Sequence, residues 1–234
     1  MKKTILVVVL LLVSVSLLAP VALGEDLLEK GDGYLREEEY SKAQEVFERA
    51  LETEPENSEL LWRLAKVQLR IGDEALEEEK LDIYRKGEEY AERAIELDPQ
   101  SPDAHYWYAS LLGRIGQTRG VLQSLFMVSP MQEALEQVLE IDPQYAGAYY
   151  VLSMLYMEAP GWPLSIGDLD QSLEYALKSV EMEPDNLDHN YNLVEVYLEK
   201  NKTVEAEKII RDMLAHPEID DHPEMKAELE KLIN

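Results

Sequence analysis

Four acid–proline pairs recur along this chain at almost constant spacing. Their prolines are 44, 44 and 41 residues apart, and each pair follows a segment in which apolar residues return every three or four positions. That period predicts amphipathic helices, and a proline just past a helix cannot continue it. Self-similarity with a period of about 20–50 residues is typical of repeat arrays, in which each repeat buries its apolar face against the next. The chain is therefore expected to be an array of helix pairs, and the sites that divide it are Glu54-Pro55, Asp98-Pro99, Asp142-Pro143 and Glu183-Pro184.

The first repeat, residues 25–57, carries the most specific pattern. Counted from residue 24, small and large residues fall at positions 8, 11, 20, 24, 27 and 32 of a 34-residue repeat, and they are Gly31, Tyr34, Ala43, Phe47, Ala50 and Pro55. This pattern resembles the tetratricopeptide repeat (TPR). The resemblance implies that the small residues let the two helices of a pair approach closely, while the large residues fill the space between them.

The remaining chain continues the same organisation. The expected fold class is all-α, a right-handed superhelical array of about five TPR-like helix pairs with expanded central repeats. After a signal segment, 1–24, a single domain covers 25–234, and its repeats are residues 25–57, 58–101, 102–145, 146–186 and 187–218. Residues 223–233 have apolar residues on one side and are predicted to be a C-terminal capping helix, because an array must cover its final apolar face.

The second, third and fourth repeats are longer than the first by about 7 to 10 residues, placed between their two helices. Inserts at equivalent places project from the same edge of an array. Two interpretations stay open: the inserts extend helices or loops that pack on neighbouring repeats, or they form an exposed rim that contacts a partner or a second molecule of the chain. The rim residues are Arg119, Leu122, Leu125, Phe126 and Trp162.

A second, looser resemblance covers residues 58–186. Long repeats, a Gly-Arg-x-Gly-Gln-x-Arg-Gly type of segment and a Pro-Gly-Trp-Pro loop are similar to exported bacterial TPR proteins, the T-component family associated with TRAP transporters. That similarity implies a periplasmic partner of a solute-binding protein for organic acids. The chain departs from lipid-anchored members of the family because it contains no cysteine.

The TPR resemblance also implies that the first helix of each pair lines a concave groove. Position 5 of the second to fifth repeats is aromatic, and these residues are Trp62, Tyr106, Tyr150 and Tyr191. Cations at nearby groove positions are Lys66, Arg70 and Arg114. We expect this surface to dock an extended peptide or an acidic group, since aromatic rings give rigid contact area and arginine binds carboxylates bidentately. In the alternative register the aromatic residues are core, and the cations pair with local carboxylates.

The first 24 residues have the form of a signal peptide. Lys2 and Lys3 precede an apolar stretch from 5 to 18, and Ala22-Leu23-Gly24 has the small-x-small pattern of a cleavage site. The alternative is an uncleaved membrane anchor. We therefore expect an exported chain that is periplasmic or otherwise extracytoplasmic.

The formal charge of −26 argues against nucleic-acid binding, because a polyanion would be repelled over long range. The sequence contains no recognisable catalytic motif, so we expect no enzyme, no metal and no cofactor, and membrane contact only through an uncleaved signal segment. The predicted function is an exported scaffold for protein–protein interaction in the cell envelope. The alternative is a transport-associated component that binds a small carboxylate or its solute-binding protein.

Overall fold

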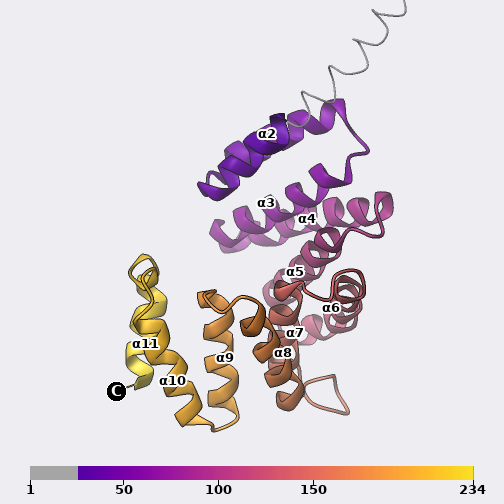
Figure 1. Cartoon of the computed structure of the whole chain (residues 1–234). Coiled ribbons are helices and arrows are strands. Elements are labelled where there is room, and N and C mark those ends of the chain that lie inside the picture. The colour runs from indigo at the N-terminus through magenta and orange to yellow at the C-terminus, as the bar shows by residue number, and fades with distance from the viewer. Residues whose placement is uncertain (1–25, 234) are drawn as a thin grey trace, which may run out of the picture. The chain divides into compact units, whose positions relative to one another are not determined.

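The computed structural model describes residues 26–233, apart from the side chain of Val121. The predicted signal peptide lies outside the described residues. Over the described range the chain is built from helices, and it divides into two compact units, one ending at Thr118 and one starting at Arg119 (Figure 1). The all-α class and the helix-pair architecture are confirmed.

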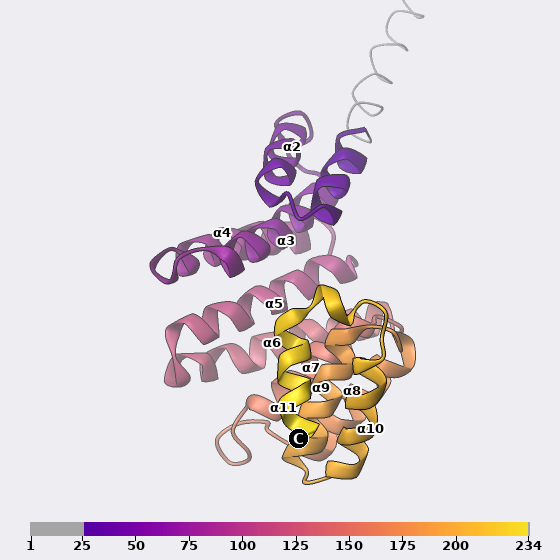
Figure 2. The same cartoon turned by 90° about the vertical axis from the view of Figure 1, so that its left-hand side faces the viewer.

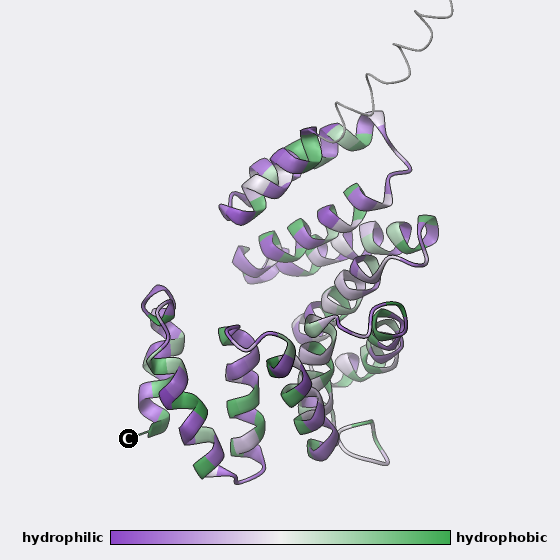
Figure 3. Ribbon diagram, in the orientation of Figure 1, coloured by the Kyte–Doolittle hydropathy of each residue, from purple (hydrophilic) through white to green (hydrophobic). Residues whose placement is uncertain are grey.

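Unit 1 contains two complete helix pairs and the first helix of a third. Residues 26–36 are helical and pair with α2. The following elements are α2 (Tyr40–Thr53), α3 (Ser58–Glu74), α4 (Glu77–Leu97) and α5 (Pro102–Arg119). Hydrophobic and hydrophilic residues alternate around each helix in Figure 3, as amphipathic helices require.

Unit 2 continues the helix pairs and ends with a further helix. Its elements are α6 (Val121–Ile141), α7 (Ala146–Glu158), α8 (Leu169–Met182), α9 (Leu187–Glu199), α10 (Thr203–Leu214), a short 3₁₀ turn η1 (Ile219–Asp221) and α11 (Pro223–Ile233). Leu229 of α11 is fully buried in one cluster with Ile210 and Met213 of α10. The expected capping helix is therefore present.

The acid–proline sites form four equivalent turns. In each turn the acidic residue's carbonyl accepts a hydrogen bond of 3.1–3.2 Å from the backbone N–H three residues later. Proline occupies the second position of each turn, where its fixed φ suits a type I turn. The fourth residue of the turn caps the next helix in three repeats; for example, the Asn57 side chain accepts from the N–H of Leu60.

Close approach within a pair depends on glycine at two places in unit 1. A Cβ built on Gly31 would overlap the ring of Phe47, and one built on Gly72 would overlap the ring of Tyr84. Both aromatic side chains are buried. The ring therefore occupies the space that a side chain on the partner helix would need.

The inserts adopt two forms. In the second repeat they lengthen α3 and α4, which only Ala75 and Leu76 separate, and in the third they lengthen α5 and α6, which only Gly120 separates. Gly120 has φ 87°, a conformation that favours glycine. In the fourth repeat the extra residues form the loop 159–168 instead. Helix extension thus accounts for two of the three inserts.

Gly31→Ala is expected to destabilise the chain by about 1–3 kcal/mol, because the added methyl displaces the Phe47 ring from a packed core. Gly33→Ala is the matched control two residues away on the same helix. Its Cβ would meet only the end of the Arg36 side chain at 3.8 Å, so a gain of up to about 1 kcal/mol is expected. Urea unfolding compares the two variants, and equal stabilities would contradict the packing argument.

Candidate binding surface on the first helices of the pairs

The first helices of unit 1 share one surface, here named the A face of unit 1 and defined by Asp32, Trp62, Arg63, Lys66, Arg70, Asp73, Tyr106, Trp107 and Arg114. Contacts between helices hold it together. The Arg63 guanidinium of α3 bonds the Asp32 carboxylate at 2.9 Å, and the Lys66 ammonium lies 5.3 Å from the ring centre of Trp107 on α5. These contacts bring the predicted cations of α3 beside the aromatic residues of α5, and α3 and α5 are labelled in Figure 2.

The two predicted aromatic residues of unit 1, Trp62 and Tyr106, are both half-buried. They pack against the buried cluster that contains Ala65 and Trp107, and the guanidinium of Arg63 lies 4.0 Å over the Trp62 ring. The structure therefore places them at the boundary between core and surface. The indole N–H groups of Trp62 and Trp107 are buried and have no acceptor among the described residues.

The three predicted cations differ in their partners. Arg114 is engaged, since its Nε lies 2.9 Å from the carboxylate of Asp73 and its guanidinium also donates to Gln117. Among residues 26–233, neither Lys66 nor Arg70 forms an ion pair. Burial, and secondarily the nearby Arg70, lowers the pKa of Lys66. Two cations of the A face thus have no ion-pair partner among the described residues.

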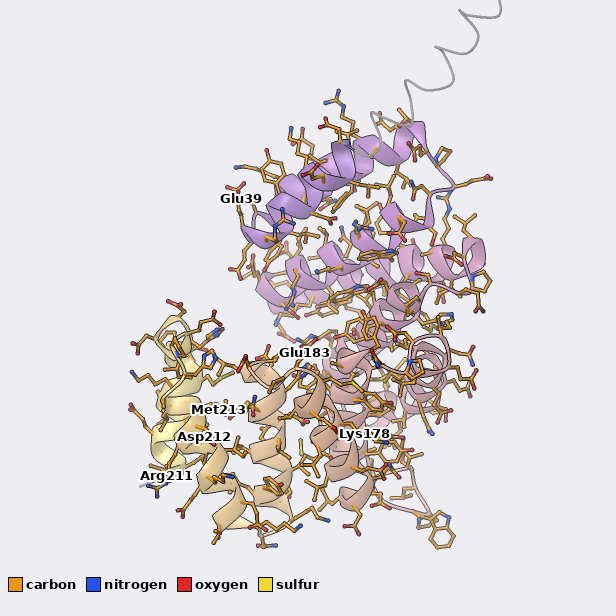
Figure 4. All side chains as sticks on the ribbon, viewed as in Figure 1. Glu39, Lys178, Glu183, Arg211, Asp212 and Met213 are labelled. Carbon is orange, nitrogen blue, oxygen red and sulfur yellow. The ribbon has the colours of Figure 1, made fainter. Side chains whose placement is uncertain are left out.

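A lysine on the second helix of a pair, unlike Lys66, does form an ion pair. Lys178 of α8, labelled in Figure 4, lies 2.9 Å from the Glu174 carboxylate four residues earlier. Its pKa is raised because it donates a hydrogen bond to that carboxylate. Such local pairing is the expected state of a cation in a chain with 48 acidic and 22 basic residues.

The first helices of unit 2 carry the other two predicted aromatic residues. Tyr150 stacks on His189 with ring centres 4.9 Å apart, and the Tyr191 hydroxyl donates to Glu228 of α11 at 2.8 Å. Burial and then this hydrogen bond raise the pKa of Tyr191 to about 12. Both rings are half-buried.

Carboxylates surround Tyr191, and the sequence analysis did not single them out. Glu195 of α9 is half-buried, and its pKa is raised by burial and then by the negative charges of Glu158, Glu228 and Glu199. The spacing of four residues between Glu195 and Glu199 was visible in the sequence. The contribution of Glu228 required knowledge of where α11 packs. Trp62 of unit 1 thus lies under a cation, whereas Tyr191 of unit 2 lies among carboxylates.

Four of the five predicted rim residues lie at the start of unit 2. Arg119, Leu122 and Phe126 are exposed, and Leu125 is half-buried. Trp162 lies in the loop after α7 and is 89% exposed. Between residues 26 and 233, no group of three His, Cys, Asp or Glu side chains is placed to hold a metal, and none of the helices there is long and apolar enough to cross a membrane.

Comparison with known proteins identifies the repeat type. Residues 27–161 match a family profile described as RMD1-3, Regulator of microtubule dynamics protein 1-3. A search of curated proteins found no match. Among solved structures, TTC0263, a thermophilic TPR protein of Thermus thermophilus, is 18% identical with a TM-score of 0.73 over 90% of this chain and 98% of that one.

Two further structures agree. PilF of Pseudomonas aeruginosa is 14% identical with a TM-score of 0.61, covering 90% of each chain. YrrB, a TPR protein described as having an unusual peptide-binding site, is 16% identical with a TM-score of 0.51, covering 88% of this chain and 90% of that one. These likenesses show the fold, and the resemblance to the TPR is confirmed. The resemblance to T-components stays a prediction.

Glu195→Gln is expected to stabilise the chain slightly at pH 7. The pKa of Glu195 is higher in the folded chain than in the unfolded chain. The stability that this difference contributes is fully present below the unfolded-state pKa, and it is lost as the pH rises through the folded-state pKa. Glutamine cannot ionise, so the variant does not lose this stability at pH 7. Because solvent screens a half-exposed carboxylate, the gain should be below about 1 kcal/mol.

Urea unfolding at pH 7 and at pH 4 measures the effect. The control is Glu181→Gln, an exposed carboxylate of α8 that changes the net charge equally. A gain at pH 4 as large as that at pH 7, or an equal gain in the control, would exclude a specific effect of the cluster.

Proposed function

Because the chain belongs to the family of Regulator of microtubule dynamics protein 1-3, we propose that its repeats are a non-catalytic scaffold for protein–protein interaction, and that the A face of unit 1 binds an extended acidic peptide. The residues that match the family, 27–161, include the whole A face of unit 1. The scaffold role follows from the likeness to TPR proteins, and the ligand is inferred from the surface itself.

The observation that carries the proposal is that neither Lys66 nor Arg70 forms an ion pair among the described residues. Removing an ammonium from water is costly unless an opposite charge comes close, and the lowered pKa of Lys66 reflects that cost. The negative charges of Asp32 and Asp103 raise the pKa of Lys66, but by less than burial and Arg70 lower it. A carboxylate of a partner would supply the missing charge, and it would gain charge-assisted hydrogen bonds from both side chains.

Aromatic side chains beside these cations favour a peptide as the ligand. Tyr106 is half-buried, so part of its ring is accessible, and the neighbouring buried Trp107 lies against Lys66. A chain of similar fold, YrrB, is described as having a peptide-binding site. The carboxylates around Glu195 in unit 2 would repel an acidic segment, so the proposal is restricted to unit 1.

The double variant Lys66→Ala, Arg70→Ala tests the proposal. Peptides are first selected from a random library with the unaltered chain, and they should be enriched in Asp and Glu. Hydrogen bonds to charged groups contribute about 1.5–3 kcal/mol each, so affinity should fall at least about tenfold in the variant. Fluorescence anisotropy of a labelled selected peptide gives the dissociation constants.

The matched control is Arg49→Ala, Lys208→Ala, which removes two exposed cations from the second helices α2 and α10. It changes the net charge equally and should leave peptide affinity unchanged. The proposal fails if both double variants weaken binding alike, or if selection shows no acidic enrichment. Succinate as a competitor separates the alternative ligand, because a site for a small free carboxylate would release the peptide at low succinate concentration.

We also propose that the scaffold acts outside the cytoplasm, in the cell envelope. Support comes from the sequence of the N-terminal segment, with its two lysines, its apolar stretch and the small residues before Glu25. Intact-mass measurement of the chain purified from envelope and cytoplasmic fractions is the test. The expected species is an envelope chain that begins at Glu25, and a full-length chain found only in the cytoplasm would contradict export.

A further inference from the structure

Two stretches of unit 2 are free of charge in a chain of which 30% of residues are charged. Residues 120–132 and residues 159–167 contain no Asp, Glu, Lys or Arg. The first stretch is Gly120 and the first half of α6, and the second is most of the loop between α7 and α8. Neither stretch therefore contributes a charged side chain.

Both stretches lie at the same end of unit 2. The turn at 142–145 reverses the chain, so α7 runs back along α6, and the Gln132 side chain of α6 reaches the Tyr156 hydroxyl of α7 at 3.3 Å. Residues 121–131 extend α6 beyond that level by about 16 Å at 1.5 Å per residue. The loop leaves α7 at the same level, where the N–H of Asp168 bonds the carbonyl of Tyr156 at 2.9 Å.

Four large apolar side chains are exposed there, here named the apolar edge: Leu122, Phe126, Trp162 and Leu164, which are 79%, 77%, 89% and 76% exposed. Leu122 and Phe126 are four residues apart and share one side of α6. The loop stands out from the helices in Figures 1 and 2. Transferring such a side chain fully out of water lowers the free energy by about 1.5–3 kcal/mol. Binding that buries these four side chains would therefore be favourable.

The shape and charge of this edge select its occupant. These side chains project from the start of a helix and from a loop tip. A fluid lipid layer can pack around them, whereas a folded protein partner would need pockets of matching shape. A second molecule of the chain carries the same charge of −26, which opposes approach. Charge also opposes anionic lipid but not zwitterionic lipid. Trp and Phe are the residues typical of the membrane interface, and the apolar stretch at 5–18 would bring the chain to a membrane during export.

We propose that the apolar edge inserts into the interfacial layer of a zwitterionic lipid bilayer and holds unit 2 on the membrane surface. The edge does not span the bilayer. This contact uses no residue of the A face of unit 1.

The absence of cysteine from the chain allows a site-specific test. Single-cysteine variants Phe126→Cys and Leu164→Cys of the exported chain, residues 25–234, are labelled with the environment-sensitive dye NBD and mixed with phosphatidylcholine vesicles. Both positions should show a blue shift and an increase in emission of about twofold or more, as the dye enters the interface. The matched control is Val204→Cys on α10, which is 78% exposed and should not respond.

A second variant guards against chance adsorption. The double variant Leu122→Ser, Trp162→Ser changes two exposed side chains, so the chain should still fold. In this variant, NBD at position 164 should lose most of its emission change with vesicles. Lys66→Ala with Arg70→Ala should leave the response unchanged, which separates this proposal from the peptide-binding one. The inference is overturned if neither edge position responds to vesicles, if position 204 responds equally, or if the edge positions respond to protein concentration without vesicles, the outcome expected for self-association.

Discussion

The close approach of two helices within a pair is the contact on which the rest of the structure depends. In the first repeat the Phe47 ring lies where a side chain on Gly31 would be, and in the second the Tyr84 ring does the same at Gly72. A buried ring over a glycine brings the helix axes near each other and removes apolar area from water at the same place. Each pair then offers an apolar face that only the next pair, or finally α11, can cover.

The connections between pairs are equally uniform, whereas the surfaces they carry differ. Four acid–proline turns use one hydrogen-bond pattern, so successive first helices start in equivalent ways. On this common frame unit 1 gathers Lys66 and Arg70 without ion-pair partners among the described residues, while unit 2 gathers Glu195, Glu199 and Glu228. A repeat architecture therefore separates folding from recognition, since side chains that point away from the core can vary in charge while packing is kept.

Much of the candidate surface followed from the repeat register. Position 5 and its neighbours pointed to Trp62, Lys66 and Arg70 of α3, and the structure places Lys66 over Trp107 and Trp62 against the cluster that contains it. The partners were less predictable. Arg114 is bound by Asp73, forty-one residues away, and Glu195 is influenced by Glu228 of α11. Such pairings join separate helices, and their distances depend on how the helices pack.

The sequence by itself determined the repeat, the helix boundaries near the four prolines and the positions of the small residues. These are local consequences of backbone geometry and of a 3.6-residue period. Only the tertiary structure decided that two inserts lengthen helices while the third forms a loop, and that Leu122, Phe126, Trp162 and Leu164 stay in solvent. Exposure and ion pairing depend on which residues are neighbours in space. An apolar residue at a helical spacing gives the same sequence pattern whether or not another helix covers it.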